Sequence, residues 1–150
     1  MNIQRETYAQ IAPDMRALIE DHWREIAHYQ DKVALDPDWE GYQHLEENGT
    51  LIIVAARDAG RLVGYSIFLI CRHLHYKQCV VAMNDVLYLK PEYRGKMVGA
   101  RLIAESEAIV KAAGAHRITW HIKPAHDFSA LLARRGYNHE ELVMGKLLGD

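Results

Sequence analysis

The chain has 150 residues, of which 49% are hydrophobic and 25% are charged, enough for the core of one ordinary globular domain over residues 1–150. Its 18 basic and 20 acidic side chains give a formal net charge of -2 at pH 7. This balance argues against general nucleic-acid binding, because affinity for a phosphate backbone requires a basic excess. No apolar run reaches the roughly 18 residues of a membrane span and no secretory signal is apparent, so we expect no membrane partner and a cytoplasmic location.

The first third of the chain is expected to form one short strand and two helices. Residues Asn2 to Tyr8 are predicted as the strand. From Ala12 onward, apolar side chains recur at the spacing of one helical face, at Met15, Leu18, Ile19, Trp23 and Ile26. A second helix is expected to open at Asp36-Pro37, with the aspartate as cap and the proline in the first helical position, and to end at Asn48-Gly49.

Two hairpins are predicted next. The strands Leu51–Ala56 and Leu62–Cys71 are joined by a tight turn over residues 57–61. A further strand run, Val80–Leu89, is expected to pair with the second of them across a loop at His73–Lys77. Together these strands form the central part of a sheet.

A basic, glycine-bearing loop, Tyr93–Ala100, leads from the last of these strands into an amphipathic helix. The first N–H groups of a helix have no intrahelical partner, and the macrodipole makes that end positive. Gly95 and Gly99 let the backbone approach a ligand closely. Arg94 and Lys96 add positive charge. We interpret the loop as a cradle for a pyrophosphate.

The C-terminal part is predicted as strand, helix and strand again. Gly114 is expected to end the long helix, and Arg117–Ile122 alternates as a strand. A short helix is predicted over Asp127–Arg134, ended by Gly136, and Tyr137–Leu148 is expected to supply one or two last strands. The sum is an α/β (α+β) fold with a mixed sheet of about six or seven strands and helices covering its faces.

Cysteine and histidine usage predicts neither a disulfide framework nor a metal centre. Cys71 and Cys79 lie in apolar, strand-like surroundings and are expected to be buried free thiols. His73 and His75 would place two imidazoles on one face of a strand, but no third ligand follows from the spacing. No metal is therefore expected.

Four stretches, in this order along the chain, resemble motifs of the GNAT superfamily of acyl-CoA-dependent N-acyltransferases. Asp58–Tyr65 is similar to the family's hairpin from the second to the third strand, and Val86–Tyr93 to its fourth strand and exit. Arg94–Ala100 resembles the (Gln/Arg)-x-x-Gly-x-(Gly/Ala) coenzyme A loop, with Met97 in place of one glycine. Leu131–Tyr137 resembles the late helix that ends in Gly-aromatic.

The resemblance implies a mostly antiparallel, GNAT-like sheet with its fourth and fifth strands splayed, acetyl-CoA as cosubstrate and an amine as acceptor. The pantetheine arm would pair with the fourth strand, and the pyrophosphate would sit on main-chain amides of the loop. The coenzyme-binding residues so implied are Leu87, Tyr88, Leu89, Arg94, Gly95, Lys96, Met97, Val98, Gly99 and Ala100. Met97 would either crowd the backbone against the pyrophosphate or point its side chain to solvent or the adenine side.

Acylation of an amine requires a free amine and a proton for the departing thiolate. Asp85 stands where many members of the family carry a glutamate, and an acid in an otherwise apolar strand is costly to bury unpaired. It is the candidate base, directly or through water, and the alternative is a structural carboxylate bonded to a turn or an arginine. Leu132 occupies the position of the family's late tyrosine, so His126, where the chain enters the late helix close to the expected thiol, is the candidate acid. The alternatives are that His126 is an exposed histidine at the helix entry, or that the thiolate leaves without an enzymatic acid.

The acceptor side would be formed by the first helices. Trp39 and Tyr42 are candidates to hold a cationic amine against their aromatic faces, with ordinary core packing as the alternative. Our hypothesis is an acetyl-CoA-dependent N-acetyltransferase that acts on a primary amine by direct attack. The competing hypothesis is a non-catalytic coenzyme A-binding or protein-interaction module on the same scaffold. The acceptor stays open between small molecules and peptides, and a homodimer is compatible with the fold.

Overall fold

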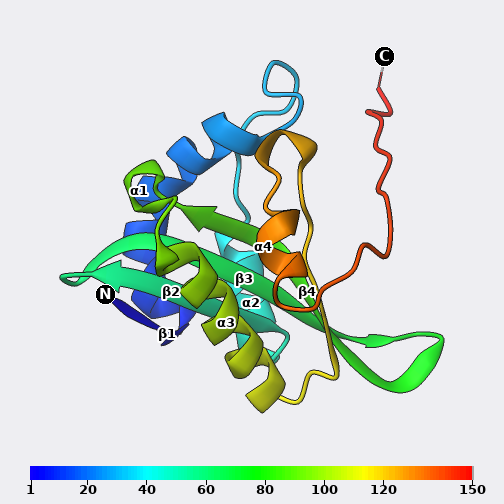
Figure 1. The fold of residues 1–150 in the computed structure, drawn as a ribbon. Coiled ribbons are helices and arrows are strands. Elements are labelled where there is room, and N and C mark those ends of the chain that lie inside the picture. The colour runs from blue at the N-terminus through cyan, green and yellow to red at the C-terminus, as the bar shows by residue number, and fades with distance from the viewer. Residues whose placement is uncertain (150) are drawn as a thin grey trace.

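The computed structural model describes residues 1–149, and Asp150, the last residue of the expected domain, lies outside the described residues. One sheet runs through it in the strand order β1-β2-β3-β4-β5 (Figure 1). The strands are β1 Asn2–Glu6, β2 Leu51–Asp58, β3 Arg61–His73, β4 Tyr76–Leu89 and β5 Arg117–Thr119. The helices are α1 Tyr8–Ile26, α2 Trp39–Glu47, α3 Met97–Ala112 and α4 Ser129–Ala133, with short 3-10 turns at Pro91–Tyr93 and Pro124–His126. Strands β1 to β4 are antiparallel neighbours, and β5 runs parallel to β4.

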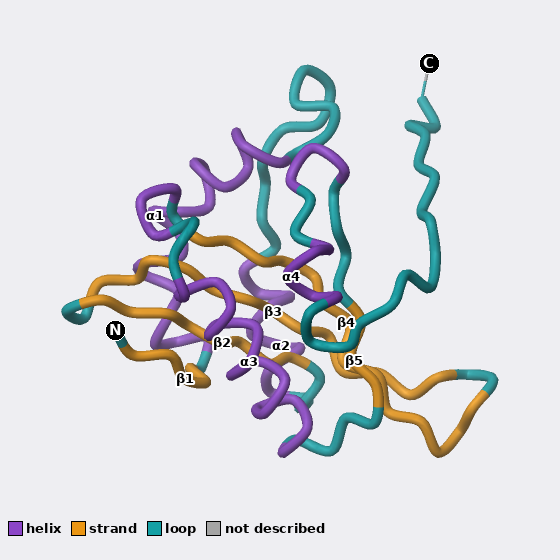
Figure 2. The backbone as a smooth tube through the Cα atoms, viewed as in Figure 1, coloured by secondary structure: helices purple, strands orange, loops and turns teal. Residues whose placement is uncertain are grey.

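Within residues 1–149 the sheet has five strands, fewer than the six or seven expected. The predicted last strands are missing, because residues 138–149 extend away from the sheet without strand pairing (Figure 2). Leu142 and Met144 are 93% and 94% exposed there. An alternating apolar pattern forms a strand only when a neighbouring edge accepts its backbone hydrogen bonds, and residues 138–149 lie beside no such edge of the described sheet.

The expected homodimer stays a prediction.

Each face of the sheet carries its own hydrophobic core. Helices α1 and α2 cover one face, where the buried side chains include Ile11, Met15, Ile53, Tyr65 and Ile67. Helix α3 covers the other, where they include Val54, Phe68, Ala82, Leu102 and Val110. In Figure 1, α3 lies in front of the sheet and α2 behind it. The predicted placement of helices on both faces is confirmed.

Local capping sets where the first two helices begin. Helix α1 starts at Tyr8, earlier than expected, because Thr7 and Gln10 form a reciprocal capping box. Helix α2 starts at Trp39, so the predicted cap at Asp36 is wrong. The Asp38 carboxylate accepts instead from the Gly41 N–H at 2.8 Å. A Cβ on Gly41 would lie 2.5 Å from that carboxylate, so a larger residue there would make the Asp38 side chain shift.

The two predicted hairpins are confirmed, with a shorter second loop. Ala59 and Gly60 adopt positive φ angles of 47° and 82°, as a two-residue turn between twisted strands requires. Only two residues separate β3 from β4, so the loop is shorter than residues 73–77. Cys71 is exposed and Cys79 half-buried, contrary to the expected burial, because this end of the hairpin extends past the last β2 pairing at Leu69. Both cysteines are free thiols, as expected.

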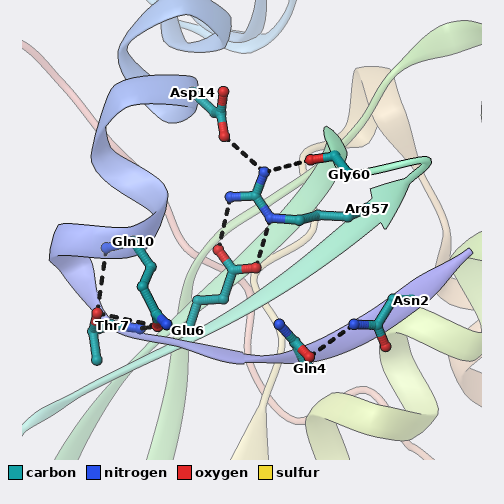
Figure 3. Close-up of polar contacts among 8 residues, drawn as sticks. All are labelled: Asn2, Gln4, Glu6, Thr7, Gln10, Asp14, Arg57 and Gly60. Carbon is teal, nitrogen blue, oxygen red and sulfur yellow. Dashed lines mark hydrogen bonds and ion pairs between the residues drawn. The ribbon is translucent and has the colours of Figure 1, made fainter.

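A buried ion-pair network ties β1, α1 and the first hairpin together (Figure 3). The Arg57 guanidinium donates to both oxygens of Glu6, at 2.7 and 2.9 Å, and the Glu6 side chain is only 3% exposed. The same guanidinium donates to Asp14 on α1 and to the Gly60 carbonyl. Glu6 raises the pKa of Arg57 further above its already high value. Breaking this pair would leave a buried carboxylate without its partner.

We therefore expect Arg57→Leu to lower the free energy of unfolding by about 3 to 4 kcal/mol. The matched control is Arg24→Leu, because Arg24 forms an ion pair with Glu20 in which both side chains are more than half exposed. That control should change stability by less than about 0.5 kcal/mol. Urea unfolding followed by circular dichroism measures both variants. Equal losses in the two would contradict the role assigned to the network.

One histidine is buried in the core between α1 and the sheet. His22 is 3% exposed, its Nδ1 lies 2.9 Å from the Tyr65 hydroxyl, and its ring stacks on Tyr88. Burial lowers the pKa of His22 to about 4, so the folded protein holds the ring neutral well below its ordinary range.

This burial makes stability depend on pH in a defined window. The folded pKa of about 4 lies below the unfolded value of 6.5, so the unfolded chain takes up a proton first as the pH falls. We expect a loss of about 2 kcal/mol between pH 7 and pH 5 from this residue, most of it below pH 6.5. Urea unfolding at both pH values measures the loss, and His22→Phe should flatten it. The exposed-site control His28→Phe should keep the pH dependence of the natural chain, and an identical slope in His22→Phe would refute the assignment.

Candidate active site

Strands β4 and β5 separate after a short parallel ladder. Their pairing covers only Val81 to Met83 of β4 and ends at Thr119 of β5, three residues before the predicted end of that strand. From residue 84 to Leu89, β4 has strand β3 on one side and no strand on the other within the described residues. The predicted splay is confirmed. Main-chain N–H and C=O groups on the free side are available to a ligand.

A β-bulge lies at the point where the strands separate. Asn84 pairs with Phe68 and Val86 with Ile67, so Asp85 is the extra residue of β4 and has no partner on β3. The buried Asn84 amide donates to the carbonyls of Ile67 and Val86, at 3.2 and 2.8 Å, and so fixes the bulge. A bulge re-aims the side chain that it carries.

The carboxylate of Asp85 contacts α2 across the opening. The Tyr42 hydroxyl donates to its Oδ2 at 3.5 Å, and no arginine pairs with it among residues 1–149. Although Asp85 as a whole is exposed, its carboxyl has lost part of its surrounding water, and this loss raises its pKa. The Tyr42 hydrogen bond and the nearby His121 lower the pKa of the carboxyl by smaller amounts. Burial, with Asp85 nearby, raises the pKa of Tyr42 to about 12, so the phenol keeps its proton and can donate.

The other two predicted site residues, Trp39 and His126, contact groups other than Asp85. Trp39 packs partly against the core, and the Arg16 guanidinium already covers its ring at 5.0 Å. The His126 ring lies 3.1 Å from the Glu25 carbonyl of α1, with its Nδ1 3.6 Å from the Glu25 carboxylate. No hydrogen bond or ion pair in the described part of the chain joins His126 to Asp85.

The loop before α3 has the features of an anion cradle. Helix α3 begins at Met97, no side chain of the described residues caps it, and its first turn carries no acidic residue. Gly95 has a φ of 69°, and nothing approaches the position of a Cβ there. A Cβ at Gly99 would meet only the Leu89 side chain, at 3.8 Å. Met97 is 71% exposed, so it points to solvent rather than crowding the loop. These residues fit a diphosphate.

Arg94 is held by the protein itself. Its guanidinium donates to both oxygens of Glu25, at 2.6 and 2.8 Å, and its Nε donates to the Leu89 carbonyl at 2.7 Å. It also lies 5.8 Å from the centre of the Tyr88 ring. Three of its five N–H donors are thus in use. This contact ties the loop to α1, and the pKa of Glu25 is lowered chiefly by it.

A cavity of about 190 Å³ lies between α1 and the sheet, and it reaches Tyr42, whose hydroxyl contacts Asp85. Its polar wall consists of His22, Tyr42, Tyr65 and Lys123, and its apolar wall includes Met15, Ile19, Trp23, Ile26, Ile67 and Val86. Tyr42 connects the cavity to Asp85, because it lines the cavity and its hydroxyl donates to the Asp85 carboxylate. The arrangement combines a carboxylate with a raised pKa, a free strand edge and a small, partly open cavity.

Several residues of this site were missed from the sequence. Asn84 carried a local signal, an amide inside an apolar strand, which is costly to bury without partners. Glu25 and Lys123 carried no such signal, because their partners are distant in the chain. Glu25 pairs with Arg94, and the Lys123 Nζ donates to the Ile26 carbonyl at 2.6 Å.

Residues 1–149 contain neither a metal-binding cluster nor a membrane-crossing helix. No cluster of three or more histidine, cysteine or acidic side chains is placed to hold a metal ion there. Among the helices of that same range, none combines the length and the apolar character that crossing a bilayer demands.

Comparisons with known proteins place this geometry in a family. Residues 13–137 match the model of the Acetyltransferase (GNAT) family. No curated protein matches the sequence. An aminoglycoside acetyltransferase from an uncultured soil metagenomic sample, solved in complex with sisomicin, has a similar structure with a TM-score of 0.74 and 16% identity, over 99% of this chain and 95% of its own.

Two more solved structures share the fold. The ribosomal-protein-alanine N-acetyltransferase of Brucella melitensis biovar Abortus 2308 has a TM-score of 0.72 and 15% identity, over 99% of both chains. A protein of Clostridium acetobutylicum, described as a predicted acetyltransferase and solved with acetyl-CoA, has a TM-score of 0.71 and 11% identity, over 98% of this chain and 96% of its own. The chain therefore belongs to the acetyltransferase (GNAT) family and is an N-acetyltransferase that uses acetyl-CoA.

Proposed function

We propose that the protein transfers an acetyl group from acetyl-CoA to a primary amine by direct attack, with Asp85 as the base. The observation that carries this proposal is the placement of the Asp85 bulge where β4 leaves β5, next to a cavity large enough for an acceptor. Acetyl-CoA supplies the activated acyl group. The chain would supply a proton acceptor for the ammonium form of the amine and a fixed approach for its nitrogen.

Asp85 suits this role because its environment moves its pKa towards that of a useful base. Loss of water raises the pKa of the carboxyl, so the carboxylate binds a proton more readily than an ordinary aspartate does. The Tyr42 hydrogen bond opposes this rise and holds the carboxylate in place. The proton would pass from the amine to Asp85, directly or through one water. For His126, the role of proton donor to the departing thiolate stays a proposal, with Glu25 as the group that positions its ring.

For the coenzyme, we propose that the diphosphate binds to main-chain amides at the start of α3, residues 96–100, and that the pantetheine arm lies along residues 87–89. The uncapped helix start and the free edge of β4 support this assignment. Arg94 would contribute mainly by positioning the loop, because Glu25 and Leu89 already occupy three of its donors. Lys96 donates to the Glu92 carbonyl and adds positive charge beside the loop.

The role of Asp85 is tested by Asp85→Asn. We expect a roughly 10²- to 10⁴-fold loss of kcat with an acetyl-CoA Kd within about twofold of the natural chain, because the amide keeps the shape but cannot take the proton. Thiol release with an amine panel measures kcat, and isothermal titration measures binding. Tyr42→Phe should move the acidic limb of the pH–rate profile to higher pH, because the hydrogen bond that lowers the pKa of Asp85 is lost. An unchanged rate in Asp85→Asn would remove the base assignment.

The cradle is tested by Gly99→Asp, with Gly99→Ala as the matched control. An aspartate in the first turn stabilises a helix but repels a bound diphosphate, so acetyl-CoA should bind roughly tenfold more weakly or worse. The alanine adds only a methyl group in ordinary contact with Leu89, so its affinity should stay near that of the natural chain. Isothermal titration reports both, and circular dichroism checks the helix. Undiminished binding by Gly99→Asp would place the diphosphate elsewhere.

A further inference from the structure

The acceptor class can be narrowed from the walls of the cavity beside Asp85, an inference that rests on the proposed function. We propose that the preferred acceptor is a monoamine with a body the size of one aromatic ring and one neutral polar substituent, and that polycationic amines are poor acceptors. The amine would lie at Asp85 and the body in the cavity. Tyr42 lies between them, since it lines the cavity and contacts the carboxylate.

The size and polarity of the cavity define the body of the acceptor. Its volume is about 190 Å³, and eight of its twelve lining residues are apolar. For comparison, a cavity of about 150 Å³ lined by aliphatic and phenylalanine side chains binds benzene. A single ring with a short aliphatic arm therefore fits the available space. A multi-ring sugar amine does not fit inside this volume.

The charge of the lining excludes a second ammonium group. Lys123 is the cationic side chain of the cavity wall, and no acidic side chain lines it among the described residues. The nearby Glu25 carboxylate is occupied by two hydrogen bonds from Arg94. An ammonium that entered the cavity would lose its water without gaining a counter-charge, and Lys123 would repel it.

His22 is a lining residue of the cavity with an unsatisfied ring nitrogen. Its Nε2 is buried and has no hydrogen-bond partner among residues 1–149, while its Nδ1 lies within hydrogen-bond distance of the Tyr65 hydroxyl. With Tyr65 as donor, Nε2 carries a proton and donates, and with the other tautomer it accepts. A hydroxyl group can satisfy either form, because it both donates and accepts. A neutral hydroxyl on the body of the acceptor thus matches this wall.

The test compares four amines on the natural chain: 2-phenylethylamine, tyramine, spermidine and kanamycin. Acetylation is followed by thiol release, and binding of 2-phenylethylamine and tyramine to the protein with CoA is measured by isothermal titration. We expect kcat/KM for the two aromatic amines to exceed that for spermidine and kanamycin by about tenfold or more. Tyramine should exceed 2-phenylethylamine by several-fold, because its hydroxyl can pair with His22.

Two variants assign these preferences to single side chains. His22→Phe should bring the tyramine to 2-phenylethylamine ratio down to about one or below. Lys123→Gln keeps an N–H donor for the Ile26 carbonyl but removes the charge, so the spermidine to 2-phenylethylamine ratio should rise several-fold. The same substitution at the exposed Lys146, outside the cavity, should leave that ratio unchanged.

The outcomes separate this inference from the proposed function. Faster acetylation of spermidine or kanamycin than of the aromatic amines would overturn the inference and leave the acetyltransferase reaction standing. Binding of acetyl-CoA with neither binding nor acetylation of any aromatic amine would also overturn it. Failure to bind acetyl-CoA at all would overturn both the proposed function and this inference about the acceptor.

Discussion

The backbone of β4 from residue 84 to Leu89 has a strand partner on the β3 side only, because β5 pairs with β4 no further than Met83. A polar backbone group must find a partner wherever it is buried, so this edge has to face water or a ligand. The bulge at Asp85 occurs at the same place, and the Asn84 amide fixes it by bonding to carbonyls on both sides. The free edge, the re-aimed carboxylate and the adjacent cavity therefore follow from one local break in the sheet.

The C-terminal end of α1 is bonded to both sides of this break. From the β4 side, Arg94 reaches the Glu25 carboxylate, and from the β5 side Lys123 donates to the Ile26 carbonyl. His126 adds a contact to the Glu25 carbonyl. The same turn of α1 contributes Ile26 to the cavity wall. The cavity and the loop before α3 thus share one support, so that a shift of this turn would change the geometry of both.

Features that depend on near neighbours in the chain could be predicted from the sequence. The Ala59-Gly60 turn, the uncapped loop before α3 and the helix stop near Gly114 all follow from residues within one turn of each other. Features that depend on distant partners could not. The ion pair of Arg94 with Glu25 joins residues 69 positions apart, and no spacing rule connects them. The predicted C-terminal strands failed for a related reason, because a strand also needs an edge that no pattern in its own residues reveals.

The residue type of Asp85 predicts only part of its proposed role in the mechanism. An aspartate in an apolar strand predicted a special role, but its partner, Tyr42, comes from α2 and sets the balance of its pKa. Loss of water raises that pKa and the phenol lowers it, so the carboxyl is poised between two opposed effects. In the proposed mechanism, an apolar acceptor in the cavity would displace further water from the opening while leaving the Tyr42 contact intact. Binding of such an acceptor would then raise the pKa of Asp85 again and make the carboxylate a stronger base at the moment when the amine is beside it.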